Sequence, residues 1–240
     1  MINFYRITNS LDSEIIGNLD QVVKAKYTCS IYDENFIDQV FFEKAKFNPI
    51  TAKAILNRGA KITDLIKTSI VGFGLKLLIS EKLKRIFEKN VDHGIEFFNS
   101  PILKDETEYS DYFVLNAFED KLDKVDFTNS EILLRRRKKS GGSETVVLEI
   151  KSDTDFLAAK NYYKNEGFLF INKLILKMVA EDFLFIRYMQ GGPGYFVSEH
   201  LKSIIEENGC TGIEFVPSEL SLQEWSAPGG LREKKYGKVD

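Results

Sequence analysis

Two pairs of adjacent residues, Ser80–Glu81 and Ser198–Glu199, place a hydroxyl beside a carboxylate, a combination found at activated nucleophiles. A nucleophilic serine also needs a base within hydrogen-bond reach and donors that stabilise an oxyanion. Neither pair lies in a Gly-x-Ser-x-Gly turn or a comparable sequence. The residue types therefore permit serine chemistry, but the surrounding sequence does not support it.

Both pairs open nearly identical segments, Ser80–Phe97 (SEKLKRIFEKNVDHGIEF) and Ser198–Phe215 (SEHLKSIIEENGCTGIEF), which agree at eleven of eighteen positions at an offset of 118 residues. Serine is favoured at the N-cap of a helix, and a glutamate after it complements the positive end of the helix dipole. From Leu83 and Leu201 onward, apolar residues follow the i, i+3, i+4 spacing of an amphipathic helix. We therefore interpret both pairs as helix caps.

A short strand is expected on either side of each predicted helix. Gly94 and Gly212 end the helical segments, and the sequences IEFF and IEFV that follow alternate as strands do. In this pattern Glu96 and Glu214 point away from the core. Each copy is thus a strand–helix–strand unit, and if its two strands share a sheet, the helical crossover makes them parallel.

Two such units at half-chain spacing predict an α+β fold made of two pseudo-repeated lobes. Each lobe has a capped helix packed on a small mixed β-sheet, because one strand–helix–strand unit cannot bury the apolar stripe of its own helix. The lobes comprise residues 1–134 and 143–240, are divided near the sequence RRRKKSGGS, and together form one compact unit.

Shorter patterns predict the remaining elements. Helices are expected at Asn48–Asn57, at Thr63–Ile70 with Thr63 or Asp64 as its cap, and at Asp155–Asn165. Residues with high β-propensity predict strands at Asn3–Thr8, Ala25–Tyr32, Tyr112–Phe118, Glu131–Arg137, Glu144–Ile150 and Phe183–Met189. The sequence KKSGGS, between two of these strands, is the strongest linker or hairpin-loop signal of the chain.

Carboxylates offer a second kind of chemistry. A hydrolase that depends on carboxylates needs at least two of them converging in a cleft with perturbed pKa values. Asp64, Asp126 and Glu96 are the candidates for such a site, and they are far apart along the chain. The sequence leaves open whether the fold brings them together.

The histidines and cysteines do not form a ligand set. His93 and His200 have no neighbouring histidine or cysteine at metal-ligand spacing, and Cys29 and Cys210 are far apart in the sequence. We therefore predict no metal, no cofactor and no disulfide framework, with both cysteines as small apolar packing residues.

The net charge limits the choice of partner. A net charge of −3 argues against a membrane or nucleic-acid binder, because such proteins usually carry a basic excess. The basic run Arg135–Lys139 lacks interleaved aromatic residues. It fits the solvated end of a hairpin better than a nucleic-acid module, which remains an alternative.

The densest acidic region runs from Asp105 to Asp126, where eight acidic residues accompany two lysines. Such a region can be a solvated face, but it also suits a basic partner, because acidic charge speeds association and contributes specificity. The sequence LKDETEYSDY within it is predicted to form an exposed loop before a strand. Five of its residues are the candidate partner contacts: Asp105, Glu106, Glu108, Tyr109 and Asp111.

Three features predict a cytoplasmic location. The two cysteines are too distant for a disulfide framework, and the sequence MINFYRITNS lacks the basic and apolar regions of a signal peptide. The most apolar segment, Phe168–Ile186, is interrupted by two lysines and two acidic residues, which argues against a membrane span.

The two Ser-Glu-x-Leu-Lys units, each closing on Gly-Ile-Glu-Phe, and the sequence VDFTNSE with Asp126 and Ser130 resemble a bacterial family. The family comprises immunity proteins of polymorphic toxin systems, and the similarity spans Asp64 to Pro217. The resemblance implies a cytoplasmic protein that binds the toxin encoded beside it and blocks it by occlusion, without catalytic residues. It identifies neither the toxin nor the oligomeric state.

We therefore expect a toxin-neutralising immunity protein, with a carboxylate-dependent hydrolase and a nucleic-acid-associated module as alternatives. The motif residues are expected to act structurally and not as partner contacts. They are Ser80, Glu81, Leu83, Gly94, Asp126, Ser130, Ser198, Glu199, Leu201 and Gly212.

Overall fold

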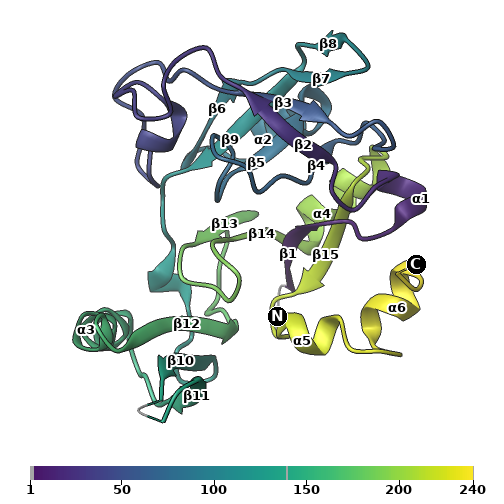
Figure 1. The fold of residues 1–240 in the computed structure, drawn as a ribbon. Coiled ribbons are helices and arrows are strands. Elements are labelled where there is room, and N and C mark those ends of the chain that lie inside the picture. Colours follow the sequence, from purple (N-terminus) through teal and green to yellow (C-terminus); the bar gives the residue numbers. More distant parts are fainter. Residues whose placement is uncertain (1–2, 139, 240) are drawn as a thin grey trace.

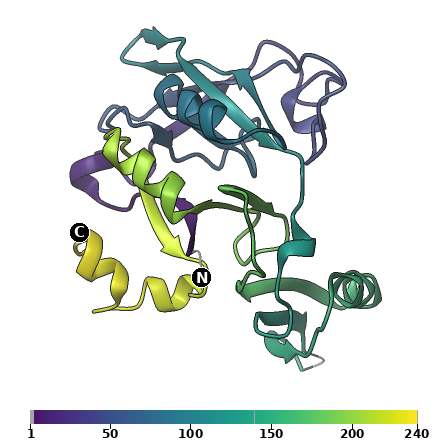
Figure 2. The same cartoon turned by 180° about the vertical axis from the view of Figure 1, so that it is seen from behind.

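The computed structural model of the chain describes residues 3–138 and 140–239. Within these residues there are six α-helices, two 3-10 helices and fifteen strands, which form four small sheets. Figures 1 and 2 show the two motif helices, α2 (Glu81–Asn90) and α4 (Glu199–Glu207), next to one another near the centre of the molecule. The α+β class predicted from the sequence is confirmed.

The first motif copy lies in an antiparallel sheet with the strand order β4-β5-β9-β6. Helix α2 connects β5 to β6, and β9 lies between these two strands. Because β5 and β6 are each antiparallel to β9, they run in the same direction, as the crossover predicted. The strands of this first motif unit are β4 (Leu65–Ile66), β5 (Leu77–Ser80), β6 (Ile95–Asn99) and β9 (Tyr112–Ala117).

The second motif copy lies in an antiparallel sheet of the same design, with the order β13-β14-β1-β15. Helix α4 connects β14 to β15, and β1 lies between them. The strands of this second motif unit are β1 (Phe4–Asn9), β13 (Phe183–Ile186), β14 (Gly194–Ser198) and β15 (Ile213–Pro217).

The two motif sheets also share their register. Leu65 pairs with Ile79 in the first sheet, and the residues 118 positions later, Phe183 and Val197, pair in the second. The equivalence ends at the inserted strand. In the first unit β9 follows β6 along the chain, whereas in the second unit the N-terminal strand β1 takes this place.

The predicted two-lobe repeat is not confirmed. Strand β1 belongs to the predicted lobe of residues 1–134, yet it completes the sheet that carries the second motif copy. Both motif sheets are antiparallel and not mixed. The two helices contact one another, and one apolar cluster contains residues of both, including Leu83, Phe87, Leu201 and Ile205. Each unit therefore buries its helix stripe against the other unit.

A mixed sheet covers the other face of the first motif sheet. Its order is β2-β3-β7-β8, and only β3 and β7 are parallel. Ala54 and Ile102 from this sheet pack with Leu78 and Val114 of the first motif sheet in a second apolar cluster. The elements of this part are α1 (Ser13–Ile16), β2 (Val22–Lys26), the 3-10 helix η1 (Ile37–Gln39), β3 (Lys53–Leu56), β7 (Ile102–Lys104) and β8 (Thr107–Tyr109).

Two helix predictions in this part are wrong. The segment Asn48–Asn57 contains β3, and the segment Thr63–Ile70 contains β4. Every second residue of β3, Ala54 and Leu56, is buried, so its apolar residues serve one face of a strand. Asp64 precedes a two-residue strand and does not cap a helix. Pairing with neighbouring strands outweighs the weak helical preference of these short segments.

The fourth sheet projects from the lower left of the molecule in Figure 1, with helix α3 packed on one face. Its order is β11-β10-β12, and all its strands are antiparallel. The predicted β10–β11 hairpin is confirmed, and Lys139 in its loop lies outside the described residues. The elements are η2 (Leu122–Lys124), β10 (Glu131–Arg137), β11 (Ser143–Leu148), α3 (Asp153–Tyr163) and β12 (Gly167–Lys173).

Most other predictions of local structure agree with the fold. The strand predicted at Ala25–Tyr32 contributes only its first two residues to β2. The other strands and the third helix are confirmed within a few residues at their ends: Asn3–Thr8, Tyr112–Phe118, Glu131–Arg137, Glu144–Ile150, Phe183–Met189 and Asp155–Asn165.

The C-terminal helices α5 (Leu222–Trp225) and α6 (Leu231–Tyr236) fold back beside the second motif unit (Figure 1). Arg232 of α6 forms a bidentate ion pair with Glu214 of β15, with Nε–Oε2 and Nη2–Oε1 distances of 2.9 and 2.7 Å. Glu214 is buried, so the prediction that it points away from the core is wrong. The C-terminal segment supplies the charge that makes this burial possible.

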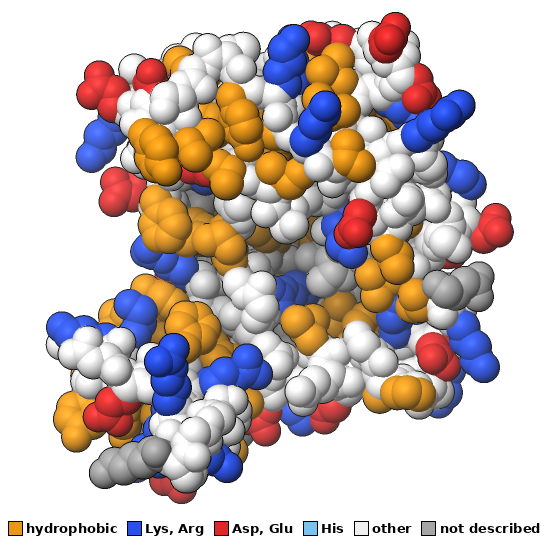
Figure 3. Space-filling model, in the orientation of Figure 1, with side chains coloured by type: hydrophobic (Ala, Val, Ile, Leu, Met, Phe, Trp, Pro, Cys, Tyr) orange, Lys and Arg blue, Asp and Glu red, His pale blue; other side chains and the backbone are white. Residues whose placement is uncertain are grey.

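The surface is hollowed between the projecting fourth sheet and the C-terminal helices (Figure 3). A cavity of about 600 Å³ lies there, lined by Asn3 and Phe4 at the N-terminus, the segment Leu174–Val179 after β12, and Ser218 and Glu219 after β15. Among the described residues, no helix combines the length and the apolar character that a membrane span requires.

Candidate functional site

The two motif serines cap their helices. The Ser80 Oγ accepts a hydrogen bond from the backbone N–H of Leu83 at 3.2 Å, and the Ser198 Oγ accepts one from Leu201 at the same distance. Both leucines are completely buried. The predicted capping role is therefore confirmed for both serines.

Each capping serine also donates its hydroxyl to an aspartate sixteen residues upstream. The Ser80 Oγ lies 2.6 Å from the Asp64 Oδ1, and Ser198 donates in the same way to Asp182 Oδ1. The backbone N–H of each serine bonds to the carbonyl of its aspartate at 2.8 and 2.9 Å. No local sequence pattern indicates these pairs, although the 118-residue offset, continued upstream of the motif, relates Asp64 to Asp182.

Asp64 joins the two motif units in a junction that we call the closed junction. Its Oδ2 accepts the backbone N–H of Thr211 at 2.8 Å and the hydroxyl of Thr211 at 3.2 Å. The Lys82 Nζ lies 3.0 Å from the same oxygen and donates to the Gly209 carbonyl at 2.9 Å. The loop after α4 is thus held on the first motif unit. Burial, with a contribution from Asp64, raises the pKa of the Cys210 thiol in this loop to about 11.

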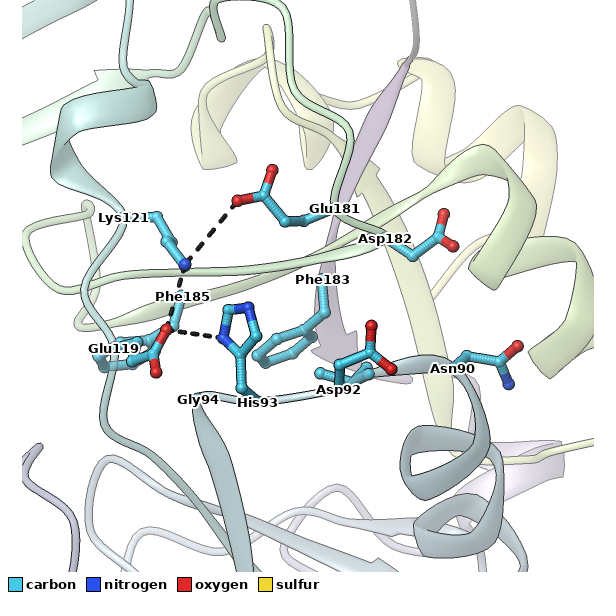
Figure 4. A pocket seen from close by; sticks show the side chains of 11 residues that line it. Asn90, Asp92, His93, Gly94, Glu119, Lys121, Glu181, Asp182, Phe183 and Phe185 are labelled. Atoms are coloured by element: carbon cyan, nitrogen blue, oxygen red, sulfur yellow. Dashed lines mark hydrogen bonds and ion pairs between the residues drawn. The ribbon is translucent and has the colours of Figure 1, made fainter.

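The equivalent place around Asp182, which we call the open junction, is a cavity of about 70 Å³. The loop after α2 faces Asp182 there, as Figure 4 shows. No hydrogen bond or ion pair joins this loop to Asp182 within the described residues. The cavity is lined by Asn90, Val91, Asp92, His93, Gly94, Glu119, Lys121, Glu181, Asp182, Phe183 and Phe185.

Polar contacts of the open junction centre on Glu119 (Figure 4). Its Oε2 lies 2.8 Å from the His93 Nδ1 and 3.2 Å from the Lys121 Nζ, and Lys121 also lies 3.8 Å from Glu181. Burial works to raise the pKa of Glu119, but hydrogen bonds from Lys121 and His93 outweigh it and lower the pKa. Glu119 therefore stays ionised and holds the His93 side chain.

The three carboxylates proposed for a hydrolase have separate structural partners. Asp64 belongs to the closed junction. Glu96 is partly buried, and its carboxylate accepts from the backbone N–H of Ala45 at 2.8 Å and from Asn116 Nδ2 at 2.9 Å. In the described ranges no hydrogen bond joins any two of Asp64, Glu96 and Asp126, so the contacts give no support to a shared acid–base site.

Asp126 and Ser130 form a turn that fastens the segment after β12. Asp126 accepts from Asn129 Nδ2 at 2.7 Å, and its backbone carbonyl accepts from the Ser130 N–H at 2.9 Å. The Ser130 Oγ accepts from the Ile175 N–H at 2.9 Å and donates to the Ile175 carbonyl. These contacts are structural in kind.

The candidate partner residues form a β-hairpin and not the predicted loop. Asp105 and Glu106 are the turn between β7 and β8, and both have positive φ angles, 47° and 68°. Glu108 is also exposed and pairs with Lys53 at 2.7 Å. Tyr109 packs in part against the apolar cluster under the mixed sheet, whereas Asp111 is exposed immediately before β9. The hairpin thus brings Asp105, Glu106 and Glu108 to one exposed tip.

The basic run is partly neutralised. Arg136 binds Glu144 across the β10–β11 hairpin at 2.8 Å, while Arg135 and Arg137 are exposed. The described residues hold no cluster of three or more histidine, cysteine or acidic side chains that suits a metal ion. Both cysteines, Cys29 and Cys210, are free thiols.

Comparison with known proteins defines the class of this fold and site. The model of the Imm11 immunity protein family matches residues 4–219, which is most of the chain. The chain therefore belongs to the Imm11 immunity protein family. A search of curated proteins gave no match.

Proposed function

We propose that this protein protects its cell by binding a cognate bacterial toxin domain and covering the surface through which the toxin acts. Membership of the immunity family over residues 4–219 carries this proposal. It points to a non-enzymatic role, and the separate structural partners of the three candidate carboxylates accord with that. The cytoplasm is the expected compartment, because free cysteines are typical of reducing conditions.

The tip of the β7–β8 hairpin is the surface that we assign to the toxin. Its carboxylates at Asp105, Glu106 and Glu108 suit a basic toxin domain, as many nucleic-acid-degrading domains are. Two-residue hairpin turns with positive φ favour Gly, Asn and Asp, because the Cβ atom of most other residues is strained there. Asp105 fits this preference, whereas Glu106 adopts a φ of 68° at a cost in backbone free energy. A glutamate at this position is not explained by the stability of the turn and accords with a role in binding.

Co-expression tests the proposed function. The toxin domain encoded beside this gene is produced in cells with and without the protein, and growth is followed. We expect growth to be restored and a complex of the two proteins to co-purify. Continued growth arrest together with the absence of a complex would contradict the proposal.

Charge reversal tests the assigned surface. Glu106→Lys with Glu108→Lys is expected to slow association with the toxin domain and to flatten its salt dependence, because long-range attraction is lost. The matched control, Glu149→Lys with Glu166→Lys, makes the same charge change at exposed positions beside the fourth sheet. Association rates at two salt concentrations distinguish the variants. Equal rates for both double variants would place the toxin elsewhere.

A further inference from the structure

The closed and open junctions occupy equivalent places in the two motif units but differ in their contacts. At the closed junction, a backbone N–H, a hydroxyl and an ammonium group converge on the Asp64 Oδ2. At the open junction, Asp182 uses its Oδ1 for the Ser198 hydroxyl. Its Oδ2 has no hydrogen-bond or ion-pair partner in the part of the chain that the structure describes. The Oδ2 of Asp182 is thus an available hydrogen-bond acceptor, whereas the Oδ2 of the equivalent Asp64 is already bound by three donors.

The residues of the chain that could close the open junction are not suited to do so. The loop position of Cys210 is taken by Asp92, whose carboxylate would repel Asp182 (Figure 4). The Thr211 position is taken by His93, which is bound to Glu119 instead. The Lys82 position is taken by His200, which is exposed. The two side-chain donors of the closed junction, the Thr211 hydroxyl and the Lys82 ammonium group, therefore have no counterpart that binds Asp182 within the described residues.

The surroundings of the cavity favour binding to a donor from another molecule. Phe183 and Phe185 form part of its lining and are almost completely buried. A hydrogen bond formed beside such apolar groups is stronger than one in water, because the local dielectric constant is low. Acidic side chains outnumber basic ones in the lining, so a cation is the complementary group. The acidic residues are Asp92, Glu119, Glu181 and Asp182, and the lysine is Lys121.

An aromatic patch adjoins the cavity through Phe185. The Phe42 ring lies 5.3 Å from the Phe185 ring, and Phe42 has a positive φ of 55°, a strained conformation for a bulky residue. The Arg187 guanidinium lies 4.8 Å from the Phe42 ring, and the neighbouring Phe41 is 52% exposed. Aromatic and arginine side chains are enriched at protein interfaces, so this patch extends the candidate surface beyond the cavity.

We propose that the open junction receives a turn of the toxin domain that reproduces the donors of the closed junction. The turn supplies a backbone N–H to Asp182 and places a lysine or arginine side chain among Asp182, Glu181 and Asp92, which line the same cavity. The inference rests on the proposed immunity function and adds to it the chemistry of a second contact site. It concerns Asp182, which lies outside the hairpin tip.

Calorimetric titration of the toxin domain into wild type, Asp182→Asn and Asp64→Asn tests this inference. Asparagine keeps an oxygen that accepts from the serine cap but removes the charge. We expect Asp182→Asn to raise Kd about 10–100-fold, the effect of losing a charged hydrogen bond and its ion pair. Asp64→Asn, the matched control at the closed junction, is expected to leave Kd unchanged and to lower the melting temperature by about 3–8 °C.

A second variant guards against an effect of Asp182→Asn on folding. Asp92→Lys places an ammonium group of the chain itself at the open junction, in an exposed loop position. It is expected to weaken toxin binding by at least about tenfold without lowering the melting temperature. A wild-type protein that binds the toxin, with both Asp182→Asn and Asp92→Lys at unchanged Kd, would overturn this inference alone. Absence of wild-type binding would overturn the proposed function and this inference with it.

Discussion

The buried ion pair between Glu214 and Arg232 is expected to dominate the attachment of the C-terminal helices. Both side chains are 2% exposed, and the guanidinium donates two hydrogen bonds to the carboxylate. The Glu214 Oε1 also accepts from the Leu11 N–H at 2.9 Å, and the Arg232 Nη1 donates to the Gly237 carbonyl at 3.0 Å. One carboxylate therefore joins the N-terminal segment, β15 and α6.

Replacement of Glu214 by glutamine tests this account. The amide keeps one oxygen for the Leu11 N–H, but its NH₂ group faces the donors of Arg232. One charged hydrogen bond is lost, which contributes about 1.5–3 kcal/mol, and the guanidinium stays buried without a countercharge. Removal of one partner of a buried pair costs about 3–5 kcal/mol in the free energy of unfolding. We expect the loss in the free energy of unfolding caused by Glu214→Gln to fall in that range.

Urea unfolding followed by circular dichroism measures this loss. With a denaturant dependence of about 2–3 kcal/mol/M for a chain of this size, the midpoint should fall by about 1–2 M. Glu108→Gln is the matched control, because the Glu108–Lys53 pair is similarly short at 2.7 Å but far more exposed, at 44% and 29%. An exposed pair contributes about 0–1 kcal/mol. If the two variants lost the same stability, the reasoning from burial would be refuted.

The remaining predictions concern the motif caps, the apolar cluster shared by α2 and α4, and the Cys210 thiol. Ser80→Ala and Ser198→Ala should each lower the free energy of unfolding by about 1–3 kcal/mol in urea titrations, because a cap is lost and a carboxylate loses its hydroxyl donor. Toxin binding should persist in both variants. Loss of binding at unchanged stability would instead show that the serines act in binding. Leu201→Ala should cost about 2–5 kcal/mol by the same measurement, since the side chain is completely buried, and a neutral result would contradict the shared core. In a Cys29→Ser background, alkylation of Cys210 at pH 8 should be about 100-fold slower than that of a free thiol, because a pKa of about 11 leaves little thiolate at that pH. The rate should rise about tenfold per pH unit up to that pKa. A rate equal to that of a model thiol would contradict the burial of Cys210.

The parts of the fold that depend on local sequence could be predicted. The stripes starting at Leu83 and Leu201, the serine caps, and the strands after Gly94 and Gly212 each follow from residue types at fixed spacing, and the structure has all of them. The short strand β3 could not be predicted, because four residues give too few positions to distinguish the two-residue period of a strand from the 3.6-residue period of a helix.

Contacts between distant segments could not be predicted from these patterns. Nothing in the sequence of β1 indicates that it pairs with β14 and β15 near the other end of the chain. For the same reason the alternation of IEFV places Glu214 away from the core in the sequence-based prediction, whereas the burial of its carboxylate depends on Arg232 in a separate helix. The Asp64–Ser80 and Asp182–Ser198 pairs are an intermediate case. The 118-residue offset of the repeat relates one pair to the other, but no local sequence pattern predicts either pair.

Direct binding of the purified toxin domain tests the central claim, that this Imm11 protein acts by occupying its cognate toxin. The measurement is a calorimetric titration of the toxin domain encoded beside this gene into the folded protein at near-physiological salt. We predict saturable binding with a fixed stoichiometry, and weaker binding at higher salt, because acidic groups carry part of the attraction. A folded protein that restores growth of toxin-producing cells but shows no heat of binding and no complex with the toxin would contradict the claim.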